Sequence, residues 1–467
     1  MKIVMFSINP LFPKKVTGGA SKHLYHIAQH LGKQGHAVSI LCAQPEEALS
    51  PFNWAQNVTV SPILPFHLPF PQPYAISGAA LSLIVDHLSM ALQDADRFYI
   101  HDGEWLIPDV YEAIPTVTSF RDNVYPESVL GTFIGKADDV ICVSGFSAAV
   151  IEYTAGRFFP DLPKRMHLVN NGIDFNLFTE VDVSDLSREL DVNPEQDIIL
   201  LHPHRPEPGK GLPETIQVVD RLVHQHGFEQ IKVLVPEWIG SMLSTGDSAF
   251  YNEMMRFMHD LDVRKHFVFV PWMPISRMPE LYSLGDATLC LGNIVEAFGN
   301  VAYESLACGT PSIVARVGVH RTMLPDDMIA KVHYGDIGSA VDRLLEIIKD
   351  DKKVEQKVGE FLSETMDFEK QVGAYADIIT SCGKRDRLQF AAPKTSPNQP
   401  YALAPWCYFD DDRIYHDFKG EFKQAAQLAE LLSRSTTISE VDSVAAGIPE
   451  QRWGEWVEAG WIVPVRQ

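Results

Sequence analysis

The chain has 467 residues and a formal net charge of −22, with 61 acidic residues against 39 basic ones. A surface this acidic repels phosphate backbones and anionic lipids, which excludes nucleic acid as an extended partner. With 46% hydrophobic and 21% charged residues, the composition is that of a globular protein large enough for two or three domains.

Cysteine usage and the N-terminus point to a reducing compartment. The six cysteines are scattered without a Cys-x-x-Cys pair, which predicts buried thiols and no disulfide framework or zinc site. The opening MKIVMFSINP lacks the length and flanks of a signal peptide, and no apolar run reaches the length of a membrane span. We therefore expect a cytoplasmic protein without a transmembrane segment.

Short apolar runs alternate with helical patterns from the start of the chain. Residues 2–7 predict a strand, and residues 20–35 predict a helix that stops at Gly35. The next strand is predicted at HAVSILC (36–42). Three further strands, each followed by a helical segment, are predicted at RFYI (97–100), PTVTSF (115–120) and DDVICVS (138–144). This alternation predicts parallel strands joined by crossover helices.

The alternation pauses at an Asn-Gly turn near residue 171 and then resumes. The later strands are predicted at DIILLHPH (197–204), IKVLVPEW (231–238), HFVFVPW (266–272), DATLCLG (286–292) and PSIVARV (311–317). We therefore expect two doubly wound α/β domains, over residues 1–180 and 181–384.

The last part of the chain differs in amino-acid composition. A linker over 385–400, containing AAPKTSPNQP, precedes a region from 401 to 467 that is rich in aromatic residues. Its helical runs and closing WGEWVEAGWIVPV predict a small winged-helix-like α+β module. Its tryptophans either complete a small core or help recruit a protein or peptide partner.

The stretch EAFGNVAYESLACGTP places two carboxylates, Glu296 and Glu304, eight positions apart around a Phe-Gly-Asn turn. We expect a helix to begin near Asn300, where unpaired N–H groups and the helix dipole form an anion site suited to phosphate. A carboxylate accepts hydrogen bonds from two vicinal hydroxyls, so the spacing fits a phosphate flanked by two polyols, as in a nucleotide-sugar. Two glutamates alone also fit a solvated loop residue and a helix-dipole partner.

Three other stretches place polar residues or glycines after predicted strands. HPHRPEPGKG carries Arg205 and Lys210 in a loop suited to neutralising a diphosphate. Gly18 and Gly19 lie between the first strand and the first helix, where paired glycines let a ligand approach the backbone. His101 directly follows RFYI and can bind a sugar hydroxyl or carry a proton. Each stretch alone also fits an ordinary loop or a structural histidine.

Together these stretches resemble the retaining GT-B glycosyltransferases of family 4 (glycosyltransferase group 1), over roughly residues 1–380. The shared features are the early Gly-Gly, the NNGID turn, the Arg…Lys-Gly loop and the Glu-x7-Glu element, in the family's order. The resemblance implies two Rossmann-like domains facing a cleft, with the acceptor-side domain over 1–180 and the donor-binding domain over 181–384. The module over 401–467 lies outside the family core.

The resemblance also implies roles for individual residues. Glu296 would hold donor-sugar hydroxyls, and Glu304 would bind the nucleotide ribose. Arg205 and Lys210 would stabilise the departing diphosphate. The remaining implied contacts are backbone N–H groups of Phe298, Gly299 and Asn300 to the donor, a contribution of Gly18 and Gly19 from the facing domain, and His101 near the reacting sugar.

Two positions depart from the family pattern. Arg121 occupies a position where the family often has a histidine, which bears on acceptor handling. Val319 replaces the second glycine of a segment that often carries Gly-Gly, which bears on sugar contacts.

The reaction that the resemblance implies is sugar transfer from a nucleotide-diphosphate donor, a UDP-sugar rather than a GDP-sugar, to an acceptor hydroxyl. It implies retention by same-face attack, with no metal and no cofactor. Asp410–Asp412 stands in the tail and is interpreted as a solvated charge run. Two alternatives stay open: a sugar-nucleotide epimerase of the same architecture, and a non-catalytic nucleotide-sugar-binding protein.

Overall fold

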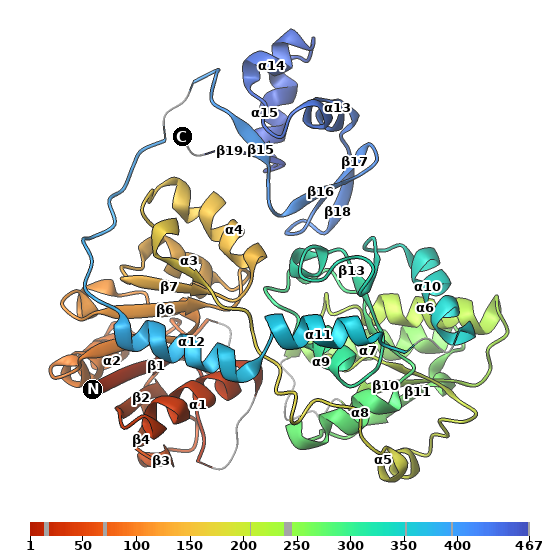
Figure 1. Cartoon of the computed structure of the whole chain (residues 1–467), viewed down its shortest axis with the longest axis horizontal. Helices are drawn as coiled ribbons and strands as arrows, with labels where there is room; N and C mark the ends of the chain where they lie inside the picture. The colour runs from red at the N-terminus through yellow and green to blue at the C-terminus, as the bar shows by residue number, and fades with distance from the viewer. Residues whose placement is uncertain are drawn as a thin grey trace. The chain divides into compact units, whose positions relative to one another are not determined.

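The computed structural model describes residues 1–13, 18–68, 72–205, 207–237, 245–350, 353–393 and 396–465. By their contacts, the residues form two compact units (Figure 1). The first comprises Met1–Asn170, Glu369–Tyr415 and Phe422–Gln467, and the second comprises Asn171–Phe368 with His416–Glu421.

The described residues of the first unit contain one sheet of eight strands. These are β1 (Lys2–Ser7), β2 (Ala37–Ala43), β3 (Phe52–Ala55), β4 (Val58–Leu64), β5 (Arg97–Ile100), β6 (Thr116–Phe120), β7 (Asp139–Cys142) and β8 (Met166–Leu168). Their spatial order is β3-β4-β2-β1-β5-β6-β7-β8. β3 pairs antiparallel with β4, and the other described pairs are parallel.

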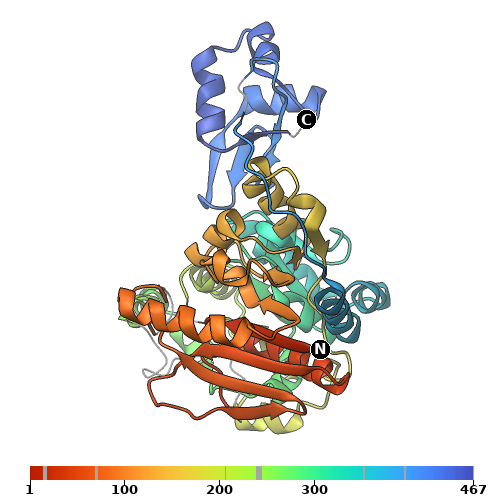
Figure 2. The same cartoon turned by 90° about the vertical axis from the view of Figure 1, so that its left-hand side faces the viewer.

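Helices cover both faces of this sheet. They are α1 (Gly18–Lys33), α2 (Gly78–Leu92), α3 (Pro126–Ile134), α4 (Gly145–Tyr153) and α12 (Phe368–Ser381). Side chains alternate along a strand, so β1 sends Ile3 and Met5 into the core beneath α1 and Val4 and Phe6 into the core beneath α2. Figure 2 shows α2, in orange, lying along the red strands of the sheet.

The second unit repeats this architecture. Its described strands are β9 (Ile198–Leu201), β10 (Ile231–Pro236), β11 (Phe267–Val270), β12 (Ala287–Cys290), β13 (Ser312–Ala315) and β14 (Ala330–Val332). They form a parallel sheet in the order β11-β10-β9-β12-β13-β14. Its described helices are α5 (Ser184–Glu189), α6 (Leu212–His224), α7 (Thr245–Asp260), α8 (Met278–Leu284), α9 (Asn300–Ala307), α10 (Ile337–Lys349) and α11 (Gln356–Thr365).

Each sheet has a point where the order of its strands reverses. In the first unit the chain proceeds outward from β1 in one direction and from β5 in the other, and in the second unit the same happens at β9 and β12. Ligands of open α/β sheets bind beyond the carboxyl ends of the strands at such a switch point. The prediction of two doubly wound α/β domains is therefore confirmed, and each domain has one place where a site is expected.

The C-terminal module is a small α+β region, as predicted. It contains β15 (Tyr401–Leu403), β16 (Cys407–Asp410), β17 (Arg413–His416), β18 (Glu421–Gln424), β19 (Ile462–Pro464), α13 (Ala426–Arg434), α14 (Glu440–Ala445) and α15 (Glu450–Glu458). β19 closes the module by pairing antiparallel with β15. Trp453 and Trp456 are buried, so they complete a core. The likeness to a winged helix stays a prediction.

The compact units divide the chain differently from the predicted domain limits, which themselves stay predictions. The first segment of the first unit ends at Asn170, and the chain rejoins this unit at Glu369. It does so because Tyr375, Ala376 and Ile379 of α12 pack in the core beneath α1. The short strands β3, β4, β8 and β14 were not predicted. They are edge or near-edge strands of three to seven residues, and β4 carries Pro62.

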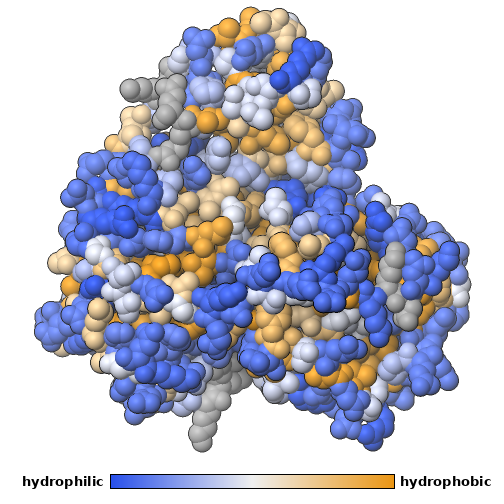
Figure 3. Space-filling model, in the orientation of Figure 1, coloured by the Kyte–Doolittle hydropathy of each residue, from blue (hydrophilic) through white to orange (hydrophobic). Residues whose placement is uncertain are grey.

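Hydrophilic residues, in blue, cover much of the face in Figure 3, with hydrophobic residues in patches between them. Within the described ranges, no helix has both the length and the apolar character needed to cross a bilayer. The six cysteines are free and buried, and burial raises the pKa of Cys42 and Cys142 to about 12, so the prediction of buried thiols is confirmed.

Candidate active site

An ion pair stands at the switch point of the second unit. Lys210 follows β9 and Glu296 follows β12, the two neighbouring strands at which the order reverses. Lys210 Nζ lies 2.5 Å from Glu296 Oε1, where it donates a hydrogen bond. The structure thus brings together two of the residues predicted to act on the donor.

Close packing of two backbones holds this pair in place. A Cβ at Gly292 would stand 2.0 Å from the carbonyl oxygen of Gly209, and one at Gly211 would stand 2.5 Å from the nitrogen of Gly292. Gly209 and Gly211 have φ values of 85° and 93°, which L side chains rarely adopt. The Ile294 amide donates to the Gly209 carbonyl at 3.0 Å and joins the loops that carry Lys210 and Glu296.

Glu296 keeps its charge in this setting. Burial acts to raise its pKa, but the charge and hydrogen bond of Lys210 outweigh burial and hold the pKa below the ordinary value. Two histidines adjoin the pair, and burial lowers the pKa of His204 and of His320 to about 4. They are therefore neutral near pH 7. The buried Nε2 of His204 has no hydrogen-bond partner within the described part of the chain.

Helix α9 begins at Asn300, as the sequence predicts. Gly299 precedes it with φ 77° and ψ 54°, and a Cβ there would meet His320 Cε1 at 2.4 Å. The Asn300 side chain accepts a hydrogen bond at 3.2 Å from Asn171, in the turn that opens the second unit. Phe298 is buried, with its ring packed edge-on against Tyr303. The first-turn N–H groups of α9 therefore begin next to Glu296 in a fixed backbone.

Glu304 lies one turn into α9. Its Oε2 accepts a hydrogen bond from the Tyr282 hydroxyl at 3.1 Å, which fixes its orientation. Tyr282 is buried in α8. The two glutamates thus lie at the start of α9, and each accepts a hydrogen bond from a protein side chain, from Lys210 to Glu296 and from Tyr282 to Glu304.

A short helical segment supports the Glu296 backbone. This is η8 (Gly318–Arg321), where the Val319 amide donates to the Glu296 carbonyl at 3.3 Å. His320 of η8 lies against Gly299 and 3.2 Å from the Tyr303 hydroxyl. Neither His204 nor His320 was predicted. The sequence signal for them is weak, because each is a single histidine outside any motif, next to Arg205 or to Val319.

Unlike Lys210, Arg205 does not pair with Glu296 in the described contacts. Its side chain is 74% exposed, and its Nε lies 3.2 Å from Glu207 Oε1. Glu207, two residues on, offers a nearer carboxylate than Glu296 does. The role of Arg205 at the diphosphate stays a prediction.

The first unit holds a second group of predicted residues at its own switch point. His101 starts η1 (His101–Gly103) directly after β5 and is buried. Its Nε2 lies 3.0 Å from the Ala20 carbonyl of α1, and its Nδ1 lies 3.0 Å from the Tyr99 hydroxyl. Burial lowers the pKa of His101 well below its ordinary value, and the nearby Arg121 lowers it further. The imidazole is therefore neutral at pH 7.

Arg121, at the end of β6, is paired with Asp102. Arg121 Nε lies 3.3 Å from Asp102 Oδ1, and both side chains are nearly buried. Burial raises the pKa of Asp102 to about 6, although the charge of Arg121 opposes this rise. Asp102 also has φ 61°, an uncommon left-handed conformation for a residue with a side chain. The acceptor-side residue predicted from the sequence thus sits in a buried, charged cluster beside His101.

Gly18 and Gly19 occupy a different place from the one predicted. They are the first two residues of α1, so they lie in its first turn and not in the preceding loop. Residues 14–17, which include Thr17, fall outside the described residues. A Cβ at Gly19 would meet nothing within 4 Å, so the described protein atoms do not require glycine there.

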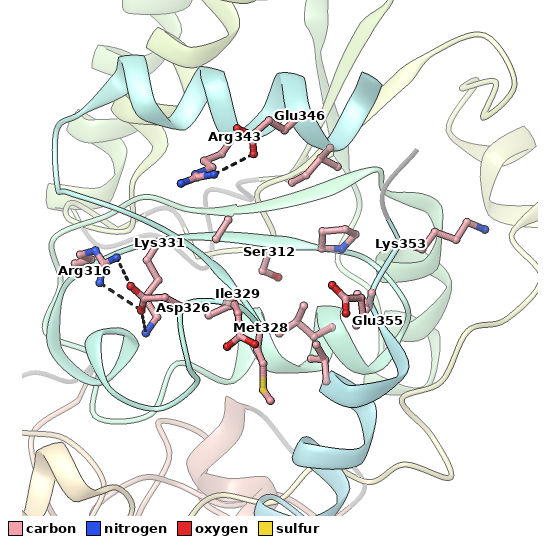
Figure 4. A pocket seen from close by; sticks show the side chains of 17 residues that line it. Ser312, Arg316, Asp326, Met328, Ile329, Lys331, Arg343, Glu346, Lys353 and Glu355 are labelled. Atoms are coloured by element: carbon pink, nitrogen blue, oxygen red, sulfur yellow. Dashed lines mark hydrogen bonds and ion pairs between the residues drawn. The ribbon is translucent and has the colours of Figure 1, made fainter. Parts of the chain in front are cut away.

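A separate pocket lies at the β13–β14 edge of the second unit, near α10 and α11 (Figure 4). Its described lining includes Arg316, Asp326 and Lys331, which pair with one another, but none of the predicted site residues. Nor do the described residues contain a group of three or more His, Cys, Asp or Glu side chains able to hold a metal ion.

Two family models match the chain in the order of its units. The model of Glycosyltransferase Family 4 matches residues 17–177, and that of Glycosyl transferases group 1 matches residues 184–361. Among curated proteins, a D-inositol 3-phosphate glycosyltransferase of Acidothermus cellulolyticus is 26% identical over 66% of this chain and 73% of its own length. An N-acetyl-alpha-D-glucosaminyl L-malate synthase of Bacillus anthracis is 24% identical over 79% of this chain and 96% of its own.

Solved structures show the same fold at lower identity. A sucrose-phosphate synthase of Thermosynechococcus elongatus superposes with a TM-score of 0.68 at 16% identity, covering 81% of this chain and 98% of that one. Anabaena HepE, in complex with UDP and glucose, gives 0.64 at 19% identity over 82% and 100%. Two Rossmann-like units of GT-B type, the paired family matches and the Lys210–Glu296 segment ahead of α9 agree. The chain belongs to the family 4 (group 1) glycosyltransferases and is a glycosyltransferase enzyme.

Proposed function

We propose that the protein transfers a sugar from a UDP-sugar to an acceptor hydroxyl, with retention of anomeric configuration and without a metal ion. The observation that carries the proposal is the Lys210–Glu296 ion pair at the β9/β12 switch point, directly ahead of the amino end of α9. A cation, a carboxylate and free N–H groups together match a sugar diphosphate, which presents both hydroxyls and negative charge.

Charge development at the leaving group is the chemical problem in this reaction. When the bond from the anomeric carbon to phosphate oxygen breaks, negative charge grows on the diphosphate. Lys210 and the first-turn N–H groups of α9 are preorganised to stabilise that charge, and electrostatic effects of this kind are usually the largest in catalysis. Arg205, on an exposed arm of the same loop, is proposed to join them at the diphosphate.

The two glutamates are proposed to orient the donor. Glu296 holds hydroxyls of the sugar, and Glu304, fixed by Tyr282, holds the ribose. Phe298, Gly299 and Asn300 present the backbone to the diphosphate. UDP is preferred to GDP as the nucleotide because Anabaena HepE has been solved with UDP and with UDP-glucose.

Retention is proposed to follow from same-face attack. The acceptor hydroxyl attacks the anomeric carbon on the side that the diphosphate leaves, and the leaving phosphate oxygen takes the hydroxyl proton. This route needs no side-chain nucleophile. His101 and Arg121 are proposed as acceptor-side residues of the first unit, and the neutral imidazole would bind an acceptor hydroxyl by exchanging its hydrogen bond to the Ala20 carbonyl or to the Tyr99 hydroxyl.

A donor-and-acceptor assay tests the proposal. The protein is incubated with UDP-glucose, UDP-N-acetylglucosamine and GDP-mannose, each with and without inositol 3-phosphate or L-malate, and with EDTA in a parallel series. We expect UDP release that depends on an acceptor and survives EDTA, and a product whose anomeric proton shows the donor's configuration by NMR. An inverted product, or activity abolished by EDTA and restored by Mg²⁺, would contradict the proposed mechanism.

The same assay separates the two rival functions. An epimerase returns a donor with altered sugar configuration and needs no acceptor. A non-catalytic binding protein shifts in thermal stability with a nucleotide, by mass action, and releases no UDP with any acceptor.

A further inference from the structure

One short turn of the C-terminal module belongs, by its contacts, to the second unit. This is the hairpin turn His416–Glu421 between β17 and β18. Asp417 in this turn is 2% exposed, and its carboxylate accepts hydrogen bonds from Arg321 Nη1 at 2.7 Å and Nη2 at 2.8 Å. It also accepts one from the Gly318 amide at 3.2 Å. A fork-like guanidinium contact of this kind fixes direction as well as distance.

Both partners of Asp417 belong to η8, the segment that supports the predicted donor site. Val319 of η8 donates to the Glu296 carbonyl, and a Cβ at Gly318 would stand 2.8 Å from that same oxygen. His320 of η8 packs on Gly299, the residue that directly precedes α9. Asp417 therefore holds the first and last residues of a segment whose middle residues contact Glu296 and Gly299.

The hairpin turn also approaches Asn293, in the loop between β12 and α9 that carries Glu296. A Cβ at Gly420 would stand 2.7 Å from Asn293 Nδ2, and Gly420 has φ 62°, a conformation that favours glycine. Asn293 in turn lies against Gly209, whose Cβ would stand 3.1 Å from Asn293 Oδ1. Asn293 therefore lies between the turn and Gly209, the residue before Lys210, and it stands in the same loop as Glu296.

A buried carboxylate is costly unless charged and hydrogen-bonded groups surround it, and removing one member of such a pair leaves the other uncompensated. The ion pair between Arg321 and Asp417 is of this buried kind, with side-chain exposures of 10% and 0%. Loss of Asp417 would therefore remove the carboxylate that accepts hydrogen bonds from both Arg321 and the Gly318 amide. The segment η8 would then lose its fixed position, while the sheet of the second unit would keep its structure.

We propose that Asp417 is a positioning residue for the donor site: through Arg321 and Gly318 it fixes η8 against Glu296 and Gly299. The turn His416–Glu421 thereby contributes to donor binding. This inference rests on the proposed function in one respect, namely that Glu296 and α9 bind the donor.

The test compares Asp417→Asn with Asp411→Asn in the full chain. Asp411 is the matched control because it makes the same charge change in an exposed turn whose left-handed φ of 52° asparagine tolerates. Hydrogen exchange measured by mass spectrometry over residues 316–322 reports on η8, and steady-state kinetics with a UDP-sugar report on donor use. We expect Asp417→Asn to speed exchange of the 316–322 peptide at least fivefold and to raise the donor KM at least tenfold, with a smaller change in kcat.

Arg321→Lys provides a second variant, because it keeps the charge but loses the two-pronged contact. It should reproduce both effects in part, and combining it with Asp417→Asn should add less than the sum of the two changes. Wild-type exchange in the 316–322 peptide together with an unchanged donor KM in both variants would overturn the proposal. Faster exchange with an unchanged donor KM would overturn it too. If the wild type uses no UDP-sugar, the proposed function fails, and the exchange measurement still decides whether Asp417 positions η8.

Discussion

Lys210 Nζ lies 2.5 Å from Glu296 Oε1, so two loops 86 residues apart in the chain meet in one ion pair. The pair depends on three glycines that let the two backbones touch, and burial keeps the nearby His204 and His320 neutral. Among the described residues, the positively charged side chain that pairs with Glu296 is therefore that of Lys210. The predictions that follow concern this arrangement and the cluster around His101.

Replacing Lys210 by alanine should lower kcat by about two decades, because removing one donor that stabilises developing charge costs about 3 kcal/mol. Lys265→Ala is the control, since Lys265 is exposed and pairs only at the surface with Glu229. Initial rates with a saturating UDP-sugar measure the effect. Equal kcat values for Lys210→Ala and the wild type would remove Lys210 from the leaving-group role.

Arg205→Ala tests whether the exposed arm of the same loop takes part in the reaction. If Arg205 reaches the diphosphate in the transition state, the variant should lose at least tenfold in kcat and little in stability, because its side chain is 74% exposed. The measurements are kcat and the thermal midpoint. A wild-type kcat would show that its pairing with Glu207 is its whole role.

Gly292→Ala should disturb the loops that hold the ion pair. Its Cβ would stand 2.0 Å from the Gly209 carbonyl, so backbone must move, at a cost of about 1–3 kcal/mol. Gly373→Ala is the matched control, since Gly373 lies inside α12 with nothing within 4 Å of the added Cβ. There alanine should stabilise the fold by about 0.5–1 kcal/mol. Denaturant titrations measure both changes, and opposite signs are expected.

The neutral histidines predict the shape of the pH–rate profile. Because burial lowers the pKa of His204 and His320 to about 4, both should lose their protons near pH 4 and stay neutral at higher pH. As the pH falls through 6.5, protonation of His320 should therefore not lower the rate. The pH–rate profiles of the wild type and of His320→Asn should have the same shape in this range. A fall in rate near pH 6.5 that is present in the wild type and abolished in the variant would show that His320 titrates in its ordinary range.

Asp102 predicts a pH dependence of stability. Its pKa is raised from 3.8 to about 6 in the folded protein by burial, so the folded state holds this proton more tightly than the unfolded state does. Its contribution to stability is full below pH 3.8 and is lost as pH rises through 6, by on the order of 3 kcal/mol. Asp102→Asn should remove this loss. Urea titrations at pH 4, 5, 6 and 7 should show the variant gaining on the wild type as pH rises, and a constant difference would contradict the assignment.

The sequence pattern predicted the strands that matter for the site. β1, β5, β9 and β12 are short, strongly apolar and buried, so periodicity and turn residues locate them well. Gly299 and the start of α9 at Asn300 were also predictable, because a glycine before an amphipathic run marks a helix start in a tight loop. Lys210 and Glu296 were each predicted as donor-site residues, from their positions after strands and from the family resemblance, but the ion pair between them was not predicted.

Other features depend on contacts that one chain segment does not encode. Arg205 and Lys210 look alike in the sequence, yet only Lys210 is carried to Glu296, because Gly209 and Gly211 turn the loop there. The packing of α12 on the first core depends on residues about 370 positions away in β1. Asp417 follows the acidic run Asp410–Asp412, and nothing in its local sequence distinguishes it as the buried one.

Calorimetric titration with UDP in the presence of EDTA tests the central claim most directly. The wild type and Lys265→Ala should bind UDP with the same affinity, and Lys210→Ala should bind it at least tenfold more weakly, because the diphosphate loses its lysine contact. Equal affinity in all three proteins, or no UDP binding by the wild type, would contradict the placement of the donor diphosphate beside Lys210 and the amino end of α9.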